Sequence, residues 1–504
     1  MSDRQAAENE PARDRKAQDR DLTSGPVAAN LLRLAGPMLF GIAAVISVQL
    51  VDTYFVGRLG TDALAALSFS FPVALTLTSL SIGLAAGAAS VVSRAVGEGE
   101  QDRLHRRATD ALLLASVIAV LMAGAGILLV RPLFQLLGAE GDVLELVVAY
   151  MRIWFVSLPF VVVPMVANAM VRACGDAFWP SFIMIAASVV NAAVTPILIF
   201  GVGPVPELGI EGAALGTLVA RALSLLMALY LVLKRDRIVE ARVPEARPFL
   251  RSAREVLRIG LPAAIGNASN PAGIAVATAL IAVLGSQVVA GFGVATRLEA
   301  FAILPMLALS SAIGPMAGQN WGAGEIGRVR RALGIAFAIC AAWSLLLAGL
   351  FALFGETIAG WFASEAAVAE EAARYLHIVP ISLWGYGVAI VAAGGYNGIG
   401  KSLTGLAYSL TRIAVFYVPM VWVASRIDGS ETVYTAIAVA NGLGGIAIAW
   451  HSLSWLKKAE ARARVETADS DGHGRQGQGG DRTQQDERAG VASAPAARTD
   501  PASC

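Results

Sequence analysis

Two acidic residues of this chain lie inside apolar stretches, where a carboxyl group could do chemistry. Asp52 lies in "SVQLVDTYFVG" (residues 47–57), and the residues that follow it are still apolar. Glu299 lies well inside another apolar stretch, two residues after Arg297. A charge at the centre of a bilayer costs about 2.5 kcal/mol or more, so acids at such depth are functional candidates by default. The expected chemistry is reversible binding of a proton or a cation.

The residues that enzymatic catalysis or metal binding would need are scattered along the chain. "GVGPVPELG" and "GLGG" are rich in glycine but lack the lysine of a phosphate-binding loop. The histidines and cysteines show no metal-ligand spacing. They are His105, His377, His451, His473, Cys174, Cys340 and Cys504. We therefore expect no catalytic residues, no metal and no cofactor; the coupling ion would be H+, with Na+ as the alternative.

The composition is that of an integral membrane protein. Of 504 residues, 56% are hydrophobic and only 15% are charged, whereas soluble domains contain about 25% charged residues. The net charge of +1 gives no indication of nucleic-acid binding. The expected partners are the lipid bilayer and small organic substrates, and we expect a monomer.

The pattern of apolar runs predicts the spans, because a membrane-spanning helix needs about 20 mostly apolar residues. The chain is predicted to be an all-α integral membrane protein with twelve transmembrane helices in two six-helix repeats. The runs cover residues 29–57, 62–93, 108–130, 143–171, 177–203, 207–233, 258–284, 287–318, 332–355, 367–397, 402–425 and 432–456.

The second half of the chain repeats the first. Adding 225 to a residue number brings glycine, proline, arginine and tyrosine residues onto identical residues without a gap, which indicates an internal duplication. The pairs include Arg33 and Arg258, Pro37 and Pro262, Gly97 and Gly322, Tyr150 and Tyr375, and Ser157 and Ser382. Asp52, by contrast, falls on Ala277. The fold itself therefore does not require an acid at position 52.

The basic residues predict the orientation. Lys and Arg are concentrated in the central linker and in the loops after the second and eighth helices, so these regions and both termini should be cytoplasmic in a plasma (inner) membrane protein. Two repeats of six helices enter the membrane in the same sense and form two lobes that can alternate access to a central site. The predicted domains are a disordered cytoplasmic N-terminal extension (1–27), a first lobe (28–233), a basic linker (234–257), a second lobe (258–458) and a disordered cytoplasmic tail (459–504).

Two stretches resemble the multidrug and toxic compound extrusion (MATE) family. They are "VATRLEAFAILPMLALSSAIGPMAGQNWGAGEIGRVRRA" (294–332) and "LLRLAGPMLFGIAAVISVQLVDTYFVGRLGTDALAALSF" in the first repeat. The resemblance extends over about residues 29–457 and is strongest for the DinF-type branch. It implies a secondary transporter that exports organic compounds in exchange for H+ or Na+.

The resemblance also implies a cation site in the first lobe. The family's helix 1 acid falls on Asp52, its helix 5 Asn on Asn191 and its helix 6 Thr on Thr217, but its helix 5 acid falls on Thr195. With one carboxylate instead of two, the site is expected to exchange a proton rather than Na+. Gln49 lies three residues before Asp52 on the same helix face and is a candidate partner for it.

The second lobe offers a weaker set of candidates. Glu299 and Arg297 match an Arg-x-Glu pair of the family, while Asn267 and Asn270 are candidate cavity donors. Asn270 falls where other branches carry a helix 7 acid. Four arginines are predicted at depth: Arg152, Arg221, Arg297 and Arg412. Each could pair between helices or extend to the interface; a cavity with more arginines than acids also leaves neutral, zwitterionic or anionic substrates open.

These observations predict a proton-coupled exporter of drugs or other organic compounds. The alternatives are a Na+-coupled exporter and a flippase for lipid-linked oligosaccharides or cell-wall precursors. A carrier of the major facilitator type would need a different basic loop from "GEGEQDRLHRRA" after helix 2. A receptor or assembly factor that transports nothing would leave the two-lobe symmetry and the buried acids unexplained.

Overall fold

The computed structural model describes residues 20–478 except residues 202, 241–244, 364 and 428, and gives side chains up to residue 465. Ten helices are long and apolar enough to cross a membrane, and two bent helix pairs bring the total to as many as twelve spans in the described part of the chain. Every regular element in these residues is helical, which confirms the predicted fold class.

The first lobe contains the first six spans. Its helices are α2 (Val27–Gly57), α3 (Thr61–Glu98), α4 (Gln101–Leu136), α5 (Gly141–Val156) with α6 (Pro159–Ala173), α7 (Phe178–Phe200), and α8 (Gly209–Tyr230) with the π-helical turn η1 (Leu231–Arg235). The break between α5 and α6 bends the fourth span by 41°. It falls at Pro159, which has no backbone N–H to continue the helix.

The second lobe contains the other six spans. They are α9 (Ala246–Ile281) with η2 (Ala282–Leu284), α10 (Ser286–Ala302) with α11 (Leu304–Gly322), α12 (Ile326–Phe362), α13 (Ala366–Ile378) with η3 (Pro380–Ser382) and α14 (Leu383–Gly398), α15 (Ser402–Leu410) with η4 (Thr411–Tyr417) and α16 (Val418–Ala424), and α17 (Ser430–Gln478). The break between α10 and α11 bends that span by 46°. The segment η4 is π-helical, a form that is rare and is frequently found at functional sites.

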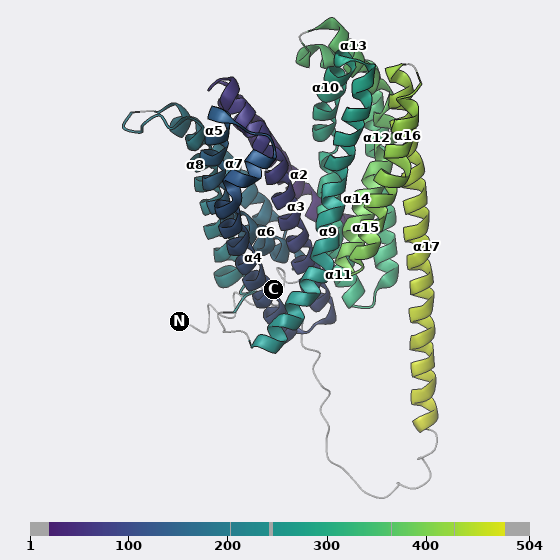
Figure 1. Ribbon diagram of the computed structural model, residues 1–504. Helices are drawn as coiled ribbons and strands as arrows, with labels where there is room; N and C mark the ends of the chain where they lie inside the picture. The colour runs from purple at the N-terminus through teal and green to yellow at the C-terminus, as the bar shows by residue number, and fades with distance from the viewer. Residues whose placement is uncertain (1–19, 202, 241–244, 364, 428, 479–504) are drawn as a thin grey trace, which may run out of the picture.

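The two lobes meet at one end of the molecule and lean apart toward the other, as Figure 1 shows. The end where they meet carries the basic loops that the sequence analysis predicts to be cytoplasmic; we call it the inner face. Small residues allow the approach there, because Gly83 of α3 faces Gly260 and Ala264 of α9 so closely that a side chain at position 83 would overlap them. Large apolar side chains such as Leu128 and Leu353 are exposed on the outside of the bundle, as expected in lipid.

Helix α2 packs against helices of both lobes. Near its start, Leu31 and Met38 belong to the same buried cluster as Ile313 and Met316 of α11 in the second lobe. Near its end, Val56 belongs to a cluster of the first lobe. The helix that carries Asp52 therefore contacts both lobes.

The structure moves three predicted boundaries: the end of the N-terminal extension, the start of the C-terminal tail and the end of the central linker. Residues 20–26 are not a detached extension, since Leu22 is fully buried. Helix α17 continues to Gln478, well into the predicted tail, and α9 begins at Ala246, inside the predicted linker. Hydropathy marks only the part of a helix that lies in lipid, so it misses helical extensions into water. Residues 1–19 and 479–504 lie outside the described residues.

Candidate functional site

In the first lobe, the structure brings Asp52 of α2 against Asn191 of α7. Two orientations of the Asn191 amide are possible, and hydrogen bonding selects one. With its nitrogen toward Asp52, Asn191 donates to both carboxylate oxygens, at 2.8 and 3.2 Å, and its oxygen accepts from Thr217 Oγ1 at 3.2 Å. The other orientation would place the amide oxygen against the carboxylate. Asn191 is therefore a donor that holds the ionised form of Asp52.

Two threonines complete this group. Thr195 follows Asn191 by one turn of α7, so the two side chains share a face. Its Oγ1 lies 3.4 Å from the amide atom of Asn191 that faces Asp52. The single hydroxyl hydrogen of Thr217 of α8 has two acceptors within reach, the amide oxygen of Asn191 at 3.2 Å and the carbonyl of Ala213 on its own helix at 3.0 Å. The structure thus brings Asp52, Asn191, Thr195 and Thr217 together, as the resemblance implied.

Close packing of α7 on α8 fixes this geometry. Gly216 of α8 lies against Thr195, and a Cβ at position 216 would lie 2.8 Å from the Cα of Thr195. Gly212 faces the backbone of Leu198 in the same way, one turn earlier in α8 and one turn later in α7. These glycines allow the two backbones to approach closely, as small residues do between membrane helices.

Arg221 adds a positive charge to the first-lobe site. It donates to Ser157 Oγ at 2.5 Å, and its guanidinium lies 5.2 Å from the ring centre of Trp154. Its charge acts on both Asp52 and Tyr150. The sequence predicts Arg221 as a deep arginine but not as a member of this site. Its position four residues after Thr217, on the same face of α8, was the available signal.

Gln49 does not pair with Asp52. Its side chain is exposed, and no hydrogen bond joins these two described side chains, although they are three residues apart on α2. The Gln49 carbonyl instead accepts from Thr53 Oγ1 at 2.8 Å. The prediction was wrong because Asn191, from another helix, donates the hydrogen bonds that the Asp52 carboxylate accepts.

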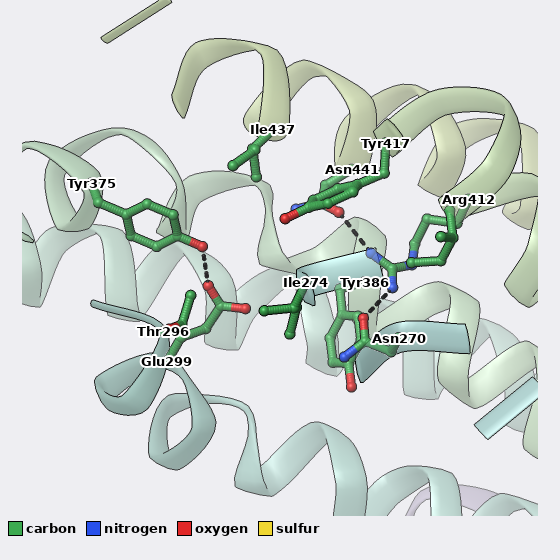
Figure 2. Close-up of a pocket in the computed structure, with 11 residues that line it drawn as sticks. Asn270, Ile274, Thr296, Glu299, Tyr375, Tyr386, Arg412, Tyr417, Ile437 and Asn441 are labelled. Carbon is green, nitrogen blue, oxygen red and sulfur yellow. Dashed lines mark hydrogen bonds between the residues drawn. The ribbon is translucent and has the colours of Figure 1, made fainter. Parts of the chain in front are cut away.

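The second lobe contains a separate polar cavity around Glu299 of α10 (Figure 2). Tyr375 of α13 donates a hydrogen bond to Glu299 Oε2. The cavity volume is about 20 Å³, enough for a water molecule but not for an organic substrate. None of the first-lobe residues described above lines it. The two lobes therefore hold two distinct polar sites.

Arg412 of η4 lies on the opposite wall of this cavity. It donates to Asn270 Oδ1 at 2.5 Å and to Asn441 Oδ1 at 3.1 Å. Its guanidinium lies 4.8 Å from the ring centre of Tyr386, and only 4% of the residue is exposed. Asn270, predicted as a cavity donor, instead offers its amide oxygen to an arginine. Asn441 and Tyr375 were not predicted as members of the cavity; for Tyr375, the repeat register with Tyr150 was a usable signal.

The remaining second-lobe candidates lie outside the cavity. Arg297 and Asn267 are exposed, and Asn267 donates to the carbonyl of Ala263 on its own helix at 2.9 Å. Arg152 is also exposed. Within the described part of the chain, no three His, Cys, Asp or Glu side chains come close enough to hold a metal ion.

Comparisons with known proteins agree with this architecture. The MatE family model matches residues 37–197 and 262–423, two ranges that begin 225 residues apart, like the repeats. A curated relative, the "FAD transporter" of Shewanella oneidensis, is 34% identical over 84% of this chain and 94% of its own length. The multidrug export protein MepA of Staphylococcus aureus is 23% identical over 84% of this chain and 92% of its own length.

A solved structure has the same fold. The crystal structure of the Vibrio cholerae MATE transporter VcmN in the bent form has a TM-score of 0.81 and 29% identity, over 87% of this chain and 98% of VcmN. These proteins are transporters rather than enzymes, and none of the comparisons divides the family into branches, so the DinF-type placement stays a prediction. The family model covers most of both lobes, and this chain therefore belongs to the MATE family of multi-pass membrane transporters.

Proposed function

We propose that this protein exports organic compounds across the plasma membrane in exchange for protons, with both termini in the cytoplasm. The observation that carries the proposal is the pairing of Asp52 with Asn191 beside Arg221 in the first lobe. A carboxylate with one amide donor and one nearby cation can change its protonation state and reorganise its partners. Both lobes belong to one chain, so a monomer suffices for the cycle.

The donors around Asp52 support H+ rather than Na+ as the coupling ion. Hard cations in proteins are held by several oxygen ligands. Here Asn191 turns its nitrogen toward the carboxylate, and the position of a second acid is taken by Thr195. Arg221 adds a fixed positive charge that opposes another cation. A proton needs no such shell of oxygen ligands.

Protonation of Asp52 removes its negative charge and weakens its hydrogen bonds, and we infer the transport step from this change. Ionised Asp52 accepts two charge-assisted hydrogen bonds from Asn191, and such bonds weaken when the acceptor becomes neutral. Neutral Asp52 also ceases to balance the charge of Arg221. Since α2 contacts both lobes, a shift at Asp52 is transmitted to the lobe interface, and we infer that it drives substrate release outside and reclosure.

Transport into proteoliposomes with an imposed pH gradient tests this proposal. Asp52→Asn should abolish proton-driven transport while leaving the protein folded. Asp62→Asn is the matched control, because Asp62 is an exposed acid at the start of α3. Undiminished proton-coupled transport by Asp52→Asn would rule the proposal out.

For the substrate, we propose an anionic aromatic compound as a second candidate beside a drug. The relative named "FAD transporter" suggests one chemical type. The observation that favours it here is Arg221 of the first-lobe site, which places a positive charge beside the ring of Trp154. Addition of FAD or of the cationic dye ethidium as a competitor in the same transport assay separates the two substrate candidates. Competition by ethidium alone would leave the drug exporter, and competition by neither would favour a lipid-linked substrate.

A further inference from the structure

Residues 20–25, which precede α2, form a segment that lies between the two lobes at the inner face; we call it the strap. On the first-lobe side, Arg20 Nη2 lies 2.9 Å from Asp176 Oδ2 and 3.0 Å from Asp236 Oδ1. Gly175 has φ of +89° and packs against the carbonyl of Arg20. A Cβ at position 175 would overlap that carbonyl. The turn between α6 and α7 is thus shaped to receive the strap.

On the second-lobe side, Leu22 is held through its backbone. Its N–H donates to Gln319 Oε1 at 3.1 Å, and its carbonyl accepts from Asn320 Nδ2 at 3.0 Å. Leu22 is fully buried, and both amide side chains lie in α11 with 1% or less exposed. The strap therefore binds through its backbone to two buried amides of the "GQNWGAG" stretch.

Arg328 extends this contact along the strap. Its Nη2 donates to the carbonyl of Ser24 at 2.9 Å and to that of Leu22 at 3.2 Å, and its Nη1 donates to the carbonyl of Gly25 at 3.1 Å. Its Nε donates to Asn320 Oδ1 at 2.8 Å. One arginine thus ties three strap carbonyls to the α11–α12 turn.

Gln319 also contacts the first lobe directly. Its Nε2 donates to the carbonyl of Ala173 at 2.7 Å, while its Oε1 accepts from the strap. The strap, α11 and the end of α6 therefore meet at one side chain. If the lobes separated at the inner face with the strap in place, the strap could not keep both Asp176 and Gln319 as partners.

We propose that the strap holds the two lobes together at the inner face and must detach from at least one of them each time the transporter opens inward. The inference rests on the alternating-access cycle of the proposed function. Detachment leaves the buried amides of Gln319 and Asn320 without strap partners, which is costly until they find new ones. Docking of the strap and closure of the inner face therefore stabilise each other.

The strap is continuous with the helix that carries Asp52. Asp52 is 25 residues after Val27, about 37 Å along α2 at 1.5 Å per residue. A change of protonation at Asp52 and release of the strap thus act on opposite ends of the same helix, α2. This connection gives the segment before the first span a part in the transport cycle.

Distance measurements between spin labels in the full-length protein test the strap. Arg106→Cys and Arg331→Cys place one label on an exposed inner position of each lobe, at equivalent positions of the two repeats. The native residues Cys174, Cys340 and Cys504 are first replaced. In this background, Arg20→Ala removes the first-lobe ion pairs, and Leu22→Asn places a polar group in the buried second-lobe contact. The matched control is Arg330→Ala, which breaks an ion pair with Glu460 inside the second lobe.

We expect each strap variant to raise the ratio of long to short inter-lobe distances at least tenfold, which corresponds to about 1.4 kcal/mol. Arg20→Lys should restore part of the short-distance population, and Arg330→Ala should leave it unchanged. The parental distance distribution in both strap variants would overturn the proposal; because they alter different contacts, either one suffices if the other does not fold. The distances report conformation without any coupling ion. Undiminished proton coupling in Asp52→Asn would therefore rule out the proposed function but leave the result for the strap standing.

Discussion

Tyr150 and Tyr375 occupy the same position of the two repeats, yet each faces charged groups that the other repeat lacks. Tyr375 donates to Glu299 in the cavity that Arg412 also lines. Tyr150 lies within electrostatic range of Asp52 and Arg221. Neither acid nor arginine has a counterpart of the same type 225 residues away: Asp52 falls on Ala277, and Arg412 falls on Ala187. Each lobe has thus acquired its own charged site on a shared helical frame.

Removal of the Asn191 amide should weaken proton coupling. In Asn191→Ala, Asp52 loses two charge-assisted hydrogen bonds, each of a kind that contributes about 1.5–3 kcal/mol. We expect proton-driven transport in proteoliposomes to fall at least about tenfold. Asn267→Ala is the control, since Asn267 bonds only to its own helix. Equal rates in the two variants would show that Asn191 does not hold Asp52 during transport.

A second acid should change the ion preference. Thr195→Asp restores the carboxylate that the family resemblance implies at this position, and it adds oxygen ligands beside Asp52. Transport at fixed pH should then gain a component that depends on Na+ and is absent when K+ replaces it. Thr53→Asp, on an exposed face of α2, controls for the added charge. Persistent indifference of Thr195→Asp to Na+ would contradict the ligand argument.

The close contact at Gly216 should reverse the usual effect of a helical Gly→Ala change. Alanine normally favours a helix over glycine by up to about 1 kcal/mol. At Gly216 the new Cβ would overlap Thr195 and force α8 from α7, and overpacking of this kind costs about 1–3 kcal/mol. Thermal unfolding in detergent should give a lower midpoint for Gly216→Ala. Gly124→Ala in α4, where a Cβ meets nothing within 4 Å, should not lower it.

The charges of the second-lobe cavity should depend on each other. Arg412→Met removes the cation that lines the same buried cavity as Glu299, and a buried charge without a compensating charge nearby is destabilising. Addition of Glu299→Gln should recover part of this loss, because no charge then stays uncompensated. Denaturation midpoints of the two single variants and the double variant measure the coupling. Strictly additive losses would mean that the two residues act independently.

Docking of the strap should not depend on pH between 5 and 8. Burial opposes ionisation of Asp21, but hydrogen bonds from Thr23 and Ser24 and the charge of Arg328 outweigh it and lower the pKa of Asp21 below its ordinary 3.8. Its contribution is therefore fully present above pH 3.8 and is lost as the pH falls through the lowered value. Burial also opposes the charge of Arg20, but Asp236 and Asp176 raise its pKa above the ordinary value, so its contribution is lost only in strong alkali.

The spin-label distances described above measure this directly when recorded across pH 5 to 8 in the Asp52→Asn background, which removes the proposed proton site. A constant distance distribution is expected. A shift within that range would assign the titration to a group near the strap rather than to Asp52.

The sequence by itself determined the twelve-helix frame, the repeat and the helices that carry the acids. These features depend on local hydropathy and on residue identity, which are written along the chain. The family resemblance added Asn191, Thr195 and Thr217 to Asp52, and the structure places all four together. The predictions for Gln49 and Asn270 differ from the structure because they concerned hydrogen-bond partners, which depend on the neighbouring helices.

Only the tertiary structure decided which side chains meet across helices. Asn191, rather than Gln49, donates hydrogen bonds to Asp52, and Arg412 donates one to the amide oxygen of Asn270. The backbone of Leu22 donates to Gln319 between the lobes. Each of these contacts joins residues at least 139 positions apart, and no local pattern encodes such a meeting. The strap shows the difference most clearly: its polar composition reads as an unfolded end, but buried amides of a distant helix supply the hydrogen bonds that order it.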